Sequence, residues 1–377
     1  MTNGSLKRKR RTAAPVPANA PAPAGVRTIA VTEDEAGMRL DRWFKRRMPT
    51  LSISHLNKIV RTGQVRVDGA RVKTAARLEA GQNVRVPPLT LDAPAAPAVR
   101  RAPSAEDARA LRDMTLFEDR DLLVLNKPFG LAVQGGSGTP HHIDGMLEAL
   151  TDEQGERPRL VHRLDRDTSG VLLIAKNRRM AADLGEIFRS RQAKKIYWAL
   201  VEGVPKPAQG RISLFLAKGE GMGEDRKAIR GMRTPGGRDL ERMRVARHGE
   251  ADAQHSVTYY AIVDKVAPKL AWLSMKPLTG RTHQLRAHAE AIGHPIIGDP
   301  KYGHRREDEQ RRRDPILAVP DDVERKLHLL ARRLVLPHPR GGTIDVTAPL
   351  SPHMQRSFEK FGFDAKQYDP IEGAPEA

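Results

Sequence analysis

The sequence predicts an α+β protein made of a small N-terminal domain and a larger C-terminal domain. Its 377 residues are enough for about two domains, and a Pro/Ala-rich linker over 88–106 separates two regions with regular hydrophobic patterns. Residues 29–87 combine helical spacing with the pattern of a short β-hairpin. In residues 107–365, short aliphatic runs typical of strands alternate with helical segments. We expect the polar residues 366–377 to form a frayed tail.

The composition indicates a cytoplasmic protein that acts on a polyanion. The formal net charge is +19, and hydrophobic residues make up 39% of the chain, which is enough for a core. The chain has no cysteine, which fits a reducing compartment. No apolar run approaches the roughly 18 residues that cross a bilayer, and no secretory signal is expected. Without a long basic amphipathic helix, a nucleic acid is favoured over a membrane as the partner, and a merely solvated basic surface is the alternative.

Residues 1–28 are predicted to be a disordered basic arm. The cluster Lys7-Arg8-Lys9-Arg10-Arg11 precedes an Ala/Pro run that cannot bury enough apolar surface to fold. Such an arm can contact phosphates without sequence preference. A nuclear-import signal is a weaker interpretation of the same cluster.

Two amphipathic helices and a hairpin are predicted in residues 29–87. Apolar residues recur at helical spacing in two stretches, at Leu40, Trp43 and Phe44 and at Leu56, Ile59 and Val60. We expect one helix over 37–47 and a second that begins at Ser52 or Ser54 and ends at Gly63. Residues 65–72 then alternate around Asp68-Gly69, which predicts two paired strands.

This module resembles the S4 RNA-binding domain. The matching residues are Arg39-Leu40-Asp41, Ser52-x-Ser54, Gly63-Gln64-Val65 and Val67-Asp68-Gly69. The resemblance implies that a basic face binds structured RNA, through Arg39, Arg42, His55, Lys58, Arg61, Arg71 and Lys73. A charged face that is simply solvated is the competing interpretation.

The most informative stretch of the larger domain is a polar loop that leads directly into a strand. Val171–Ala175 is short and aliphatic, as in a buried strand, and Asp165 lies on the loop before it. Arg163 and Arg166 flank Asp165, and nearby positive charge favours the anionic form of a carboxylate. Such a carboxylate suits nucleophilic or electrostatic chemistry on an anionic substrate. The residue types alone leave a structural ion pair equally open.

Neither a kinase nor a metal site is favoured by these motifs. The order His162-Arg163-Leu164-Asp165 differs from the kinase His-Arg-Asp loop, and neither an Asp-Phe-Gly nor a glycine-rich nucleotide loop accompanies it. His141 and His142 have no further ligand at suitable spacing. His283 and His288 are five residues apart rather than four. No metal is therefore predicted.

Further elements of this domain follow from pattern. A buried strand over 122–125 is broken by Asn126-Lys127-Pro128-Phe129-Gly130. A helix is expected over 180–189, and a strand over 194–203 that contains Tyr197, a residue type more often found in the core than in a site. Residues 218–252 form a polar, basic insert, expected to be a mobile RNA-contacting hairpin or loop or simply a solvated excursion.

Three motifs, in this order, resemble the RluA/RluC family of pseudouridine synthases: Asn126–Gly130, His162–Gly170 and Thr279–Arg286. The resemblance covers roughly residues 29–365 and implies a catalytic domain built on a mixed, largely antiparallel β-sheet with a cleft across its middle. In the family the aspartate at the position of Asp165 is the essential catalytic residue.

The same resemblance implies roles for further residues. Arg286 corresponds to the basic residue that pairs with the catalytic aspartate, and Leu285 to an aliphatic neighbour of it. Tyr197 corresponds to the tyrosine that contacts the target base. Arg163 is the candidate for entering the RNA helix, where it would hold the extruded uridine.

The family converts uridine to pseudouridine without a cofactor, so none is expected here. An S4-like module with HRLDRDTSG is most similar to the RluC type, which acts on large-subunit (23S) ribosomal RNA. The alternatives are an RluD-type or tRNA synthase, and a catalytically silent RNA-binding ribosome-assembly factor. Whether Asp165 attacks C1′ or removes a ribose proton to give a glycal is left open by the sequence. A monomer is expected.

Overall fold

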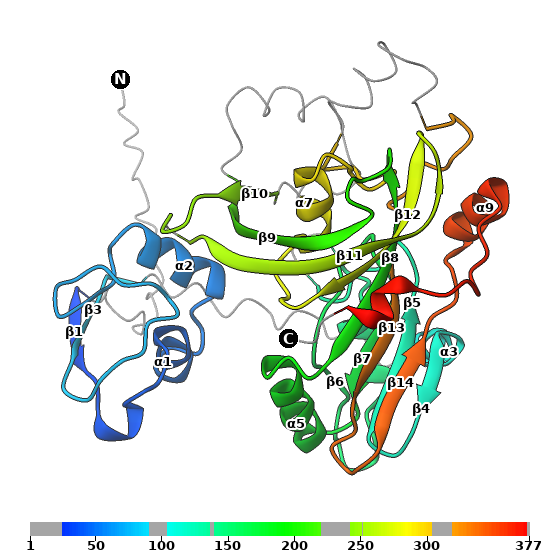
Figure 1. The fold of residues 1–377 in the computed structure, drawn as a ribbon. Helices are drawn as coiled ribbons and strands as arrows, with labels where there is room; N and C mark the ends of the chain where they lie inside the picture. The colour runs from blue at the N-terminus through cyan, green and yellow to red at the C-terminus, as the bar shows by residue number, and fades with distance from the viewer. Residues whose placement is uncertain are drawn as a thin grey trace, which may run out of the picture. The chain divides into compact units, whose positions relative to one another are not determined.

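The computed structural model describes residues 25–89, 104–135, 139–219, 242–250, 252–303 and 319–374. The chain divides into two units, residues 1–100 and 101–377 (Figure 1). Nearly all of the predicted basic arm, most of the linker and most of the insert over 218–252 lie outside the described residues. None of the helices in the described part of the chain is both long and apolar enough to cross a membrane.

The first unit consists of two helices and a small sheet. Its elements are β1 (Arg27–Ala30), the 3-10 turn η1 (Glu33–Glu35), α1 (Leu40–Arg47), α2 (Ile53–Arg61), β2 (Arg66–Val67) and β3 (Asn83–Val86). The sheet has the strand order β1-β3-β2, and both pairings are antiparallel. The apolar residues that predicted the helices, Leu40, Trp43, Phe44, Leu56, Ile59 and Val60, form its buried core together with Val84 and Val86.

The ends of the two helices have local causes. The side chain of Ser52 accepts a hydrogen bond from the amide of His55, which confirms Ser52 as an N-cap. Gly63 follows α2 with φ +74°, where a residue without Cβ is favoured. Helix α1 begins at Leu40 rather than at residue 37, because Gly37 has φ +75° and the carbonyl of Met38 accepts the amide of Leu78 instead of a helical one.

The predicted hairpin over 65–72 is wrong in its second strand. Asp68 and Gly69 do form the tight turn, with φ +48° and +79°. Beyond it, however, β2 pairs with β3, with Val67 opposite Val84. The side chain of Asp68 accepts the amide of Asn83, so the turn is attached to the distant strand. This pairing buries both Val67 and Val84 in the core of the unit.

The second unit is built on an 11-stranded sheet with the order β10-β9-β11-β12-β8-β13-β7-β5-β4, to which β14 adds beside β13 and β6 beside β7 (Figure 1). Its strands are β4 (Thr115–Glu118), β5 (Leu122–Lys127), β6 (Arg159–Leu160), β7 (Ser169–Ala175), β8 (Lys194–Glu202), β9 (Gln209–Lys218), β10 (Met243–Ala246), β11 (Gln254–Val266), β12 (Leu270–Pro277), β13 (Leu329–Pro337) and β14 (Thr343–Thr347). All pairings are antiparallel except β7 with β13. The mixed, largely antiparallel sheet is therefore confirmed.

Helices pack on both faces of this sheet. On one face, α5 (Arg178–Arg189) and α9 (Pro352–Phe361) contribute Leu184 and Phe358 to a core with Leu173 and Trp272. On the other face lie α3 (Ala105–Asp113), α4 (Ile143–Met146) with the 3-10 turn η2 (Leu147–Leu150), and α7 (Gln284–Ala291). The turn η3 (Pro370–Gly373) packs near β11 and β12. The strands predicted at 122–125, 171–175 and 194–203 and the helix at 180–189 are confirmed.

The parallel join between β7 and β13 brings distant segments into one row. Gly170 lies opposite Ala331, and Ala331 lies opposite Tyr197 on β8. Gly170 has φ +107°, and a Cβ there would lie 2.2 Å from the carbonyl oxygen of Ala331, so only glycine permits this approach. The loop before β7 and the tyrosine of β8 are thus held at the two edges of the same strand.

Candidate active site around Asp165

Asp165 lies on the loop between β6 and β7, which pair as a hairpin with Leu160 opposite Ile174. The carbonyl of Asp165 accepts the amide of Thr168, which tightens the loop. The side chain of Leu164 is buried in the core and fixes the residue before Asp165. Short pairing and a buried neighbour therefore hold the carboxylate on an otherwise polar loop.

His162 supports this loop from its other side. Its Nε2 accepts the amide of Leu173, and its ring stacks on Phe188 with the centroids 4.8 Å apart. Burial lowers the pKa of His162 to about 3, so the ring stays neutral and keeps its lone pair for the strand amide. His162 is a structural acceptor in this arrangement.

Lys127 joins the first and second motifs. It is fully buried, and its Nζ donates to the carbonyls of Pro128, Leu131 and Arg166 at 2.8–2.9 Å. Burial lowers the pKa of Lys127 to about 7. The three carbonyl acceptors match the three N–H donors of an ammonium group, so the hydrogen bonds favour the charged form. Because Arg166 directly follows Asp165, the lysine anchors the backbone of the loop that carries Asp165.

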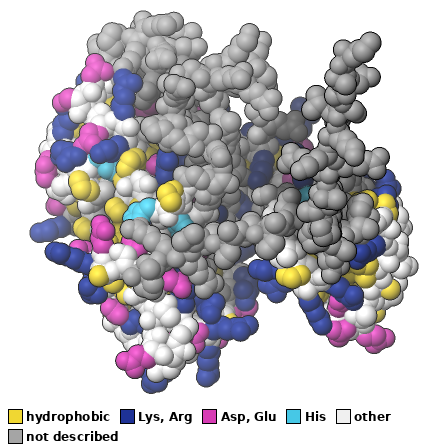
Figure 2. Space-filling view, turned by 180° about the vertical axis from the view of Figure 1, so that it is seen from behind, with side chains coloured by type: hydrophobic (Ala, Val, Ile, Leu, Met, Phe, Trp, Pro, Cys, Tyr) yellow, Lys and Arg dark blue, Asp and Glu magenta, His cyan; other side chains and the backbone are white. Residues whose placement is uncertain are grey.

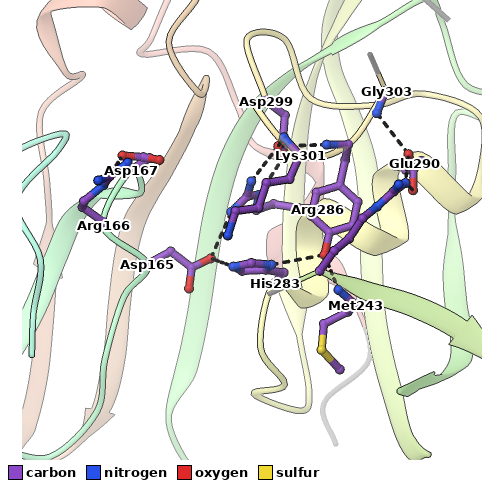
Figure 3. A network of polar contacts seen from close by, with 12 residues as sticks. Asp165, Arg166, Asp167, Met243, His283, Arg286, Glu290, Asp299, Lys301 and Gly303 are labelled. Atoms are coloured by element: carbon purple, nitrogen blue, oxygen red, sulfur yellow. Dashed lines mark hydrogen bonds and ion pairs between the residues drawn. The ribbon is translucent and has the colours of Figure 1, made fainter. Parts of the chain in front are cut away.

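The Asp165 carboxylate faces two side chains from the segment 283–286. Its Oδ2 lies 3.6 Å from Nη1 of Arg286 and 3.8 Å from Nε2 of His283 (Figure 3). The Asp165 side chain is 26% exposed, whereas those of Arg286 and His283 are 3% and 6% exposed. The partly accessible carboxylate of Asp165 therefore faces the buried guanidinium of Arg286 and the buried ring of His283.

Arg286 is held by a buried carboxylate. Its Nε and Nη2 donate to the two oxygens of Asp299 at 2.7 and 2.6 Å, and its guanidinium lies 5.1 Å from the ring centre of Tyr302. Burial opposes the charge of Arg286, but the hydrogen bonds and charge of Asp299 and the charge of Asp165 outweigh it and raise the pKa of Arg286. Arg286 therefore stays charged, with Nη1 directed at Asp165.

The start of α7 is anchored to β11 by one buried amide side chain. Gln284 donates to the carbonyl of Val257 and to the hydroxyl of Thr258, and it accepts from the hydroxyl of Thr279. Thr279 and Gln284, two residues of the third motif, therefore take part in the hydrogen bonds that attach α7 to β11. The next two residues, Leu285 and Arg286, are positioned by these bonds.

Tyr197 and Leu285 line the apolar side of the site. Tyr197 is half-buried and packs against the cluster that contains Leu285 and against the one that contains Leu164. Burial and the negative charge of Asp165 raise the pKa of Tyr197, so its hydroxyl stays protonated. The structure thus brings Asp165, Arg286, Leu285 and Tyr197 together.

The two arginines that flank Asp165 in the sequence are directed to other partners. Arg166 pairs with Asp167 at 3.1 Å, and the exposed Arg163 donates to Gln134 at 3.4 Å. Positive charge reaches Asp165 from Arg286, a residue far away in the sequence. The arginine that pairs with Asp165 is therefore Arg286 of α7, and not Arg163 or Arg166 as we expected from the sequence.

The sequence did not single out His283, Asp299, Tyr302 or Lys127 as site residues. Lys127 and His283 belong to the first and third motifs and Asp299 and Tyr302 follow the third, but nothing in their spacing shows that they converge near Asp165. His283 had been considered only as a zinc ligand together with His288, whose Nε2 lies 2.8 Å from the hydroxyl of Ser256. Among the described residues, no group of His, Asp or Glu side chains could hold a metal ion.

The cations expected to bind RNA in the first unit lie mainly on its surface. Those exposed are Arg39, Arg42, Lys58, Arg61, Arg71 and Lys73, and His55 is half-buried. Arg39 pairs with Asp41 at 2.6 Å, which partly neutralises it. On the face in Figure 2, Lys and Arg side chains are spread over the described surface with Asp and Glu between them.

Comparison with known proteins places this site in a family. The model of the family "RNA pseudouridylate synthase" matches residues 121–291, which include Asp165, Tyr197 and Arg286. Ribosomal large subunit pseudouridine synthase C of Escherichia coli strain K12 is 35% identical over 89% of this chain and 96% of that protein. The protein of the same name from Vibrio vulnificus is 38% identical over 75% of this chain and 82% of its own length. The solved structure of human RNA Pseudouridylate Synthase Domain Containing 4 is 27% identical, with a TM-score of 0.49, and covers 68% of this chain and 95% of that one.

Proposed function

This chain belongs to the RluC-like pseudouridine synthases, and from that membership we propose that it isomerises uridines of large-subunit ribosomal RNA with Asp165 as the catalytic carboxylate. The observation that carries the assignment of Asp165 is its position, on a fixed loop and 3.6 Å from the buried guanidinium of Arg286. Two relatives named ribosomal large subunit pseudouridine synthase C support the RNA substrate.

The reaction breaks the N1–C1′ glycosidic bond of uridine, turns the uracil, and joins its C5 to C1′, so substrate and product are isomers. Asp165 acts either by attacking C1′ or by removing a ribose proton to give a glycal, and both routes use an unprotonated carboxylate. Arg286 stabilises the negative charge of Asp165 because the two groups are close and Arg286 is shielded from water. No redox step or external group donor enters this balance.

The target uridine must leave its base stack, which costs a few kcal/mol that protein contacts offset. Tyr197 contacts the extruded uracil, and Leu285 closes the apolar side of the pocket beside it. Arg163 is exposed and lies on the same loop as Asp165, so it can enter the space that the base leaves. These roles account for a pocket with one charged side and one apolar side.

We further propose that the first unit binds the RNA outside the catalytic pocket in the manner of an S4 domain, and that the protein works as a monomer in the cytoplasm. Exposed cations such as Lys58 and Arg61 would contact phosphates. Replacing both by Ala should weaken RNA binding at all sites alike. It should also lower the slope of log affinity against log salt by about one for each phosphate that is no longer bound. An unchanged slope would remove these two residues from the interface.

The central test replaces Asp165 by Asn in the full-length protein. Tritium release from C5-labelled uridine in ribosomal RNA should fall to background, while the RNA dissociation constant stays within a few-fold, since the amide keeps the shape of the side chain. Asp167→Asn is the matched control, because Asp167 lies on the same loop but pairs with Arg166. Full activity of the Asp165 variant would refute the assignment of that residue.

The RNA substrate is tested separately, by mapping pseudouridines in ribosomal and transfer RNA from a deletion strain. Sites in large-subunit RNA should be lost and should return with the wild-type gene but not with the Asp165→Asn gene. Loss confined to transfer RNA would overturn the ribosomal substrate while leaving the chemistry intact.

A further inference from the structure

The reacting carboxylate has a second neighbour besides Arg286. His283 Nε2 lies 3.8 Å from the same Oδ2 atom that faces Arg286 (Figure 3). We propose that His283 is a positioning residue of this reaction, which in its neutral form aims an Nε2–H at Oδ2 of Asp165 and thereby selects Oδ1 as the oxygen that reacts. This inference rests on the proposed role of Asp165 in pseudouridine formation.

A chain of hydrogen bonds determines which ring nitrogen carries the proton. The backbone amide of Met243 donates to the Tyr302 hydroxyl oxygen at 2.8 Å, and that oxygen lies 3.1 Å from Nδ1 of His283. Burial raises the pKa of Tyr302, so the phenol keeps its proton and can donate it to Nδ1. With Nδ1 as the acceptor, the ring hydrogen of neutral His283 is on Nε2, the atom that faces Asp165. In this order the Met243 amide donates to Tyr302, Tyr302 donates to Nδ1 of His283, and Nε2–H of His283 faces Asp165.

The ring is also fixed mechanically. His283 is the N-cap residue of α7, with φ +49° and ψ 23°, a left-handed conformation that is uncommon for a residue with a Cβ. Its ring packs edge-on against Tyr302, with centroids 5.8 Å apart and planes at 88°. Unfavourable backbone conformations of this kind persist where the surrounding structure imposes them, and they concentrate at functional sites.

The two contacts make the two carboxylate oxygens unequal. Arg286 and His283 both face Oδ2, and the other oxygen of Asp165 points away from them (Figure 3). At 3.6 and 3.8 Å these contacts are longer than hydrogen bonds, and catalytic contacts commonly tighten only when substrate is bound. A small movement of the loop toward α7 would therefore lock the carboxylate with Oδ1 presented to the sugar.

The test compares two substitutions of equal length. Glutamine at position 283 carries an amide N–H at about the reach of Nε2, whereas methionine has the same reach and no donor. We expect His283→Gln to keep most of the single-turnover rate of pseudouridine formation and His283→Met to lose ~10- to 100-fold. The RNA dissociation constant should stay within a few-fold in both. Both variants bear the same backbone strain, so a purely structural role predicts equal rates, and that result would overturn the proposal.

A second comparison tests the chain through Tyr302. Tyr302→Phe removes the hydroxyl but keeps the ring beside Arg286, so we expect a loss of several-fold in the wild-type background. In the His283→Met background the same change should have no further effect on the rate, because its influence passes through the imidazole. Additive losses would contradict this route. Wild-type protein that formed no pseudouridine in any RNA would instead refute the proposed function itself.

Discussion

Arg286 and Asp299 form a bidentate ion pair from which water is excluded, with Nε–Oδ2 and Nη2–Oδ1 distances of 2.7 and 2.6 Å. The Asp299 side chain has no exposed surface, and its Oδ1 also accepts the amides of Lys301 and Tyr302. This pairing occupies the edge of the guanidinium formed by Nε and Nη2 and leaves Nη1 for Asp165. The surroundings of the Asp165 carboxylate therefore depend on Asp299, a second carboxylate with no exposed surface.

Replacing Arg286 by Lys should remove this geometry while keeping a positive charge. An ammonium cannot bind both oxygens of Asp299 and still reach Asp165 from a fixed position. We expect the single-turnover rate to fall by about 100-fold or more, since small misplacements of reacting groups have effects of this size. Rapid-quench kinetics with a saturating excess of protein would measure it. A rate within a few-fold of wild type would show that charge alone suffices.

Asp299→Asn should act mainly on stability. It leaves the buried guanidinium beside a neutral partner, and breaking a buried ion pair from one side costs about 3–5 kcal/mol. Denaturant unfolding of the second unit would measure the loss. The control is Asp345→Asn, which breaks the partly exposed pair with Arg333 and should cost about 1 kcal/mol or less. Equal losses of unfolding free energy in the two variants would contradict the larger contribution that we assign to the buried Arg286–Asp299 pair.

Lys127→Met should loosen the loop that carries Asp165, because Lys127 holds the backbone of that loop. The substitution removes three hydrogen bonds to partly buried carbonyls, each worth about 0.5–1.5 kcal/mol, and more where the donor is charged. We expect a lower melting temperature and faster hydrogen exchange in residues 161–168 than in the wild type. Lys265→Met, at an exposed lysine of β11, is the matched control and should change neither.

Gly170→Ala should destabilise the second unit far more than Gly130→Ala. Both glycines have positive φ, +107° and +84°, so both substitutions carry backbone strain. Only at Gly170 would the new Cβ overlap the Ala331 carbonyl, whereas nothing lies within 4 Å of the position at Gly130. We expect the free energy of unfolding to fall by about 1–2 kcal/mol for Gly130→Ala and by about 4 kcal/mol or more for Gly170→Ala. Urea titrations of both, or proteolysis if one is insoluble, would show the difference.

The first unit should lose stability in acid through Glu35. Hydrogen bonds from Arg47 lower the pKa of this buried carboxyl from its usual 4.5 to about 2, against the effect of burial, and Trp43 adds a further hydrogen bond. Because the pKa is depressed in the folded state, this stabilisation is complete above about pH 4.5 and is lost as the pH falls toward 2. In the wild type, the protection of the amides of residues 25–89 against hydrogen exchange should fall over this pH range. In Glu35→Gln the dependence should be weaker, while Glu33→Gln, at an exposed glutamate of the same turn, should behave as wild type.

Local pattern predicted some of the strands and helices, because periodicity reports which side of an element is buried. The runs around Leu123, Leu173 and Leu184 satisfied this rule and were confirmed. Strand pairing in the first unit was not accessible in this way, since Val67 joins Val84 across an intervening segment rather than the residues after its own turn. Which strands meet depends on the core as a whole, and a local turn signal does not encode it.

The site was predicted in part. The family motifs indicated Asp165, Arg286, Leu285 and Tyr197, and the structure brings these four together. They did not indicate that Asp299 holds Arg286 in place beside Asp165, or that the Tyr302 hydroxyl contacts Nδ1 of His283. Those contacts join residues from separate segments whose types are common in surface loops, so their burial and mutual distance become visible only in three dimensions.

The row Gly170–Ala331–Tyr197 has a consequence for how substrate choice can change in this protein. The aspartate loop and the tyrosine are attached to opposite edges of β13, so backbone hydrogen bonds set the spacing between them. Exchanging surface segments would alter which RNA is admitted and leave this spacing untouched. A shift of β13 by one residue would displace the Asp165 loop and Tyr197 together. The reaction should therefore tolerate wide sequence variation in the surface segments and almost none in β13.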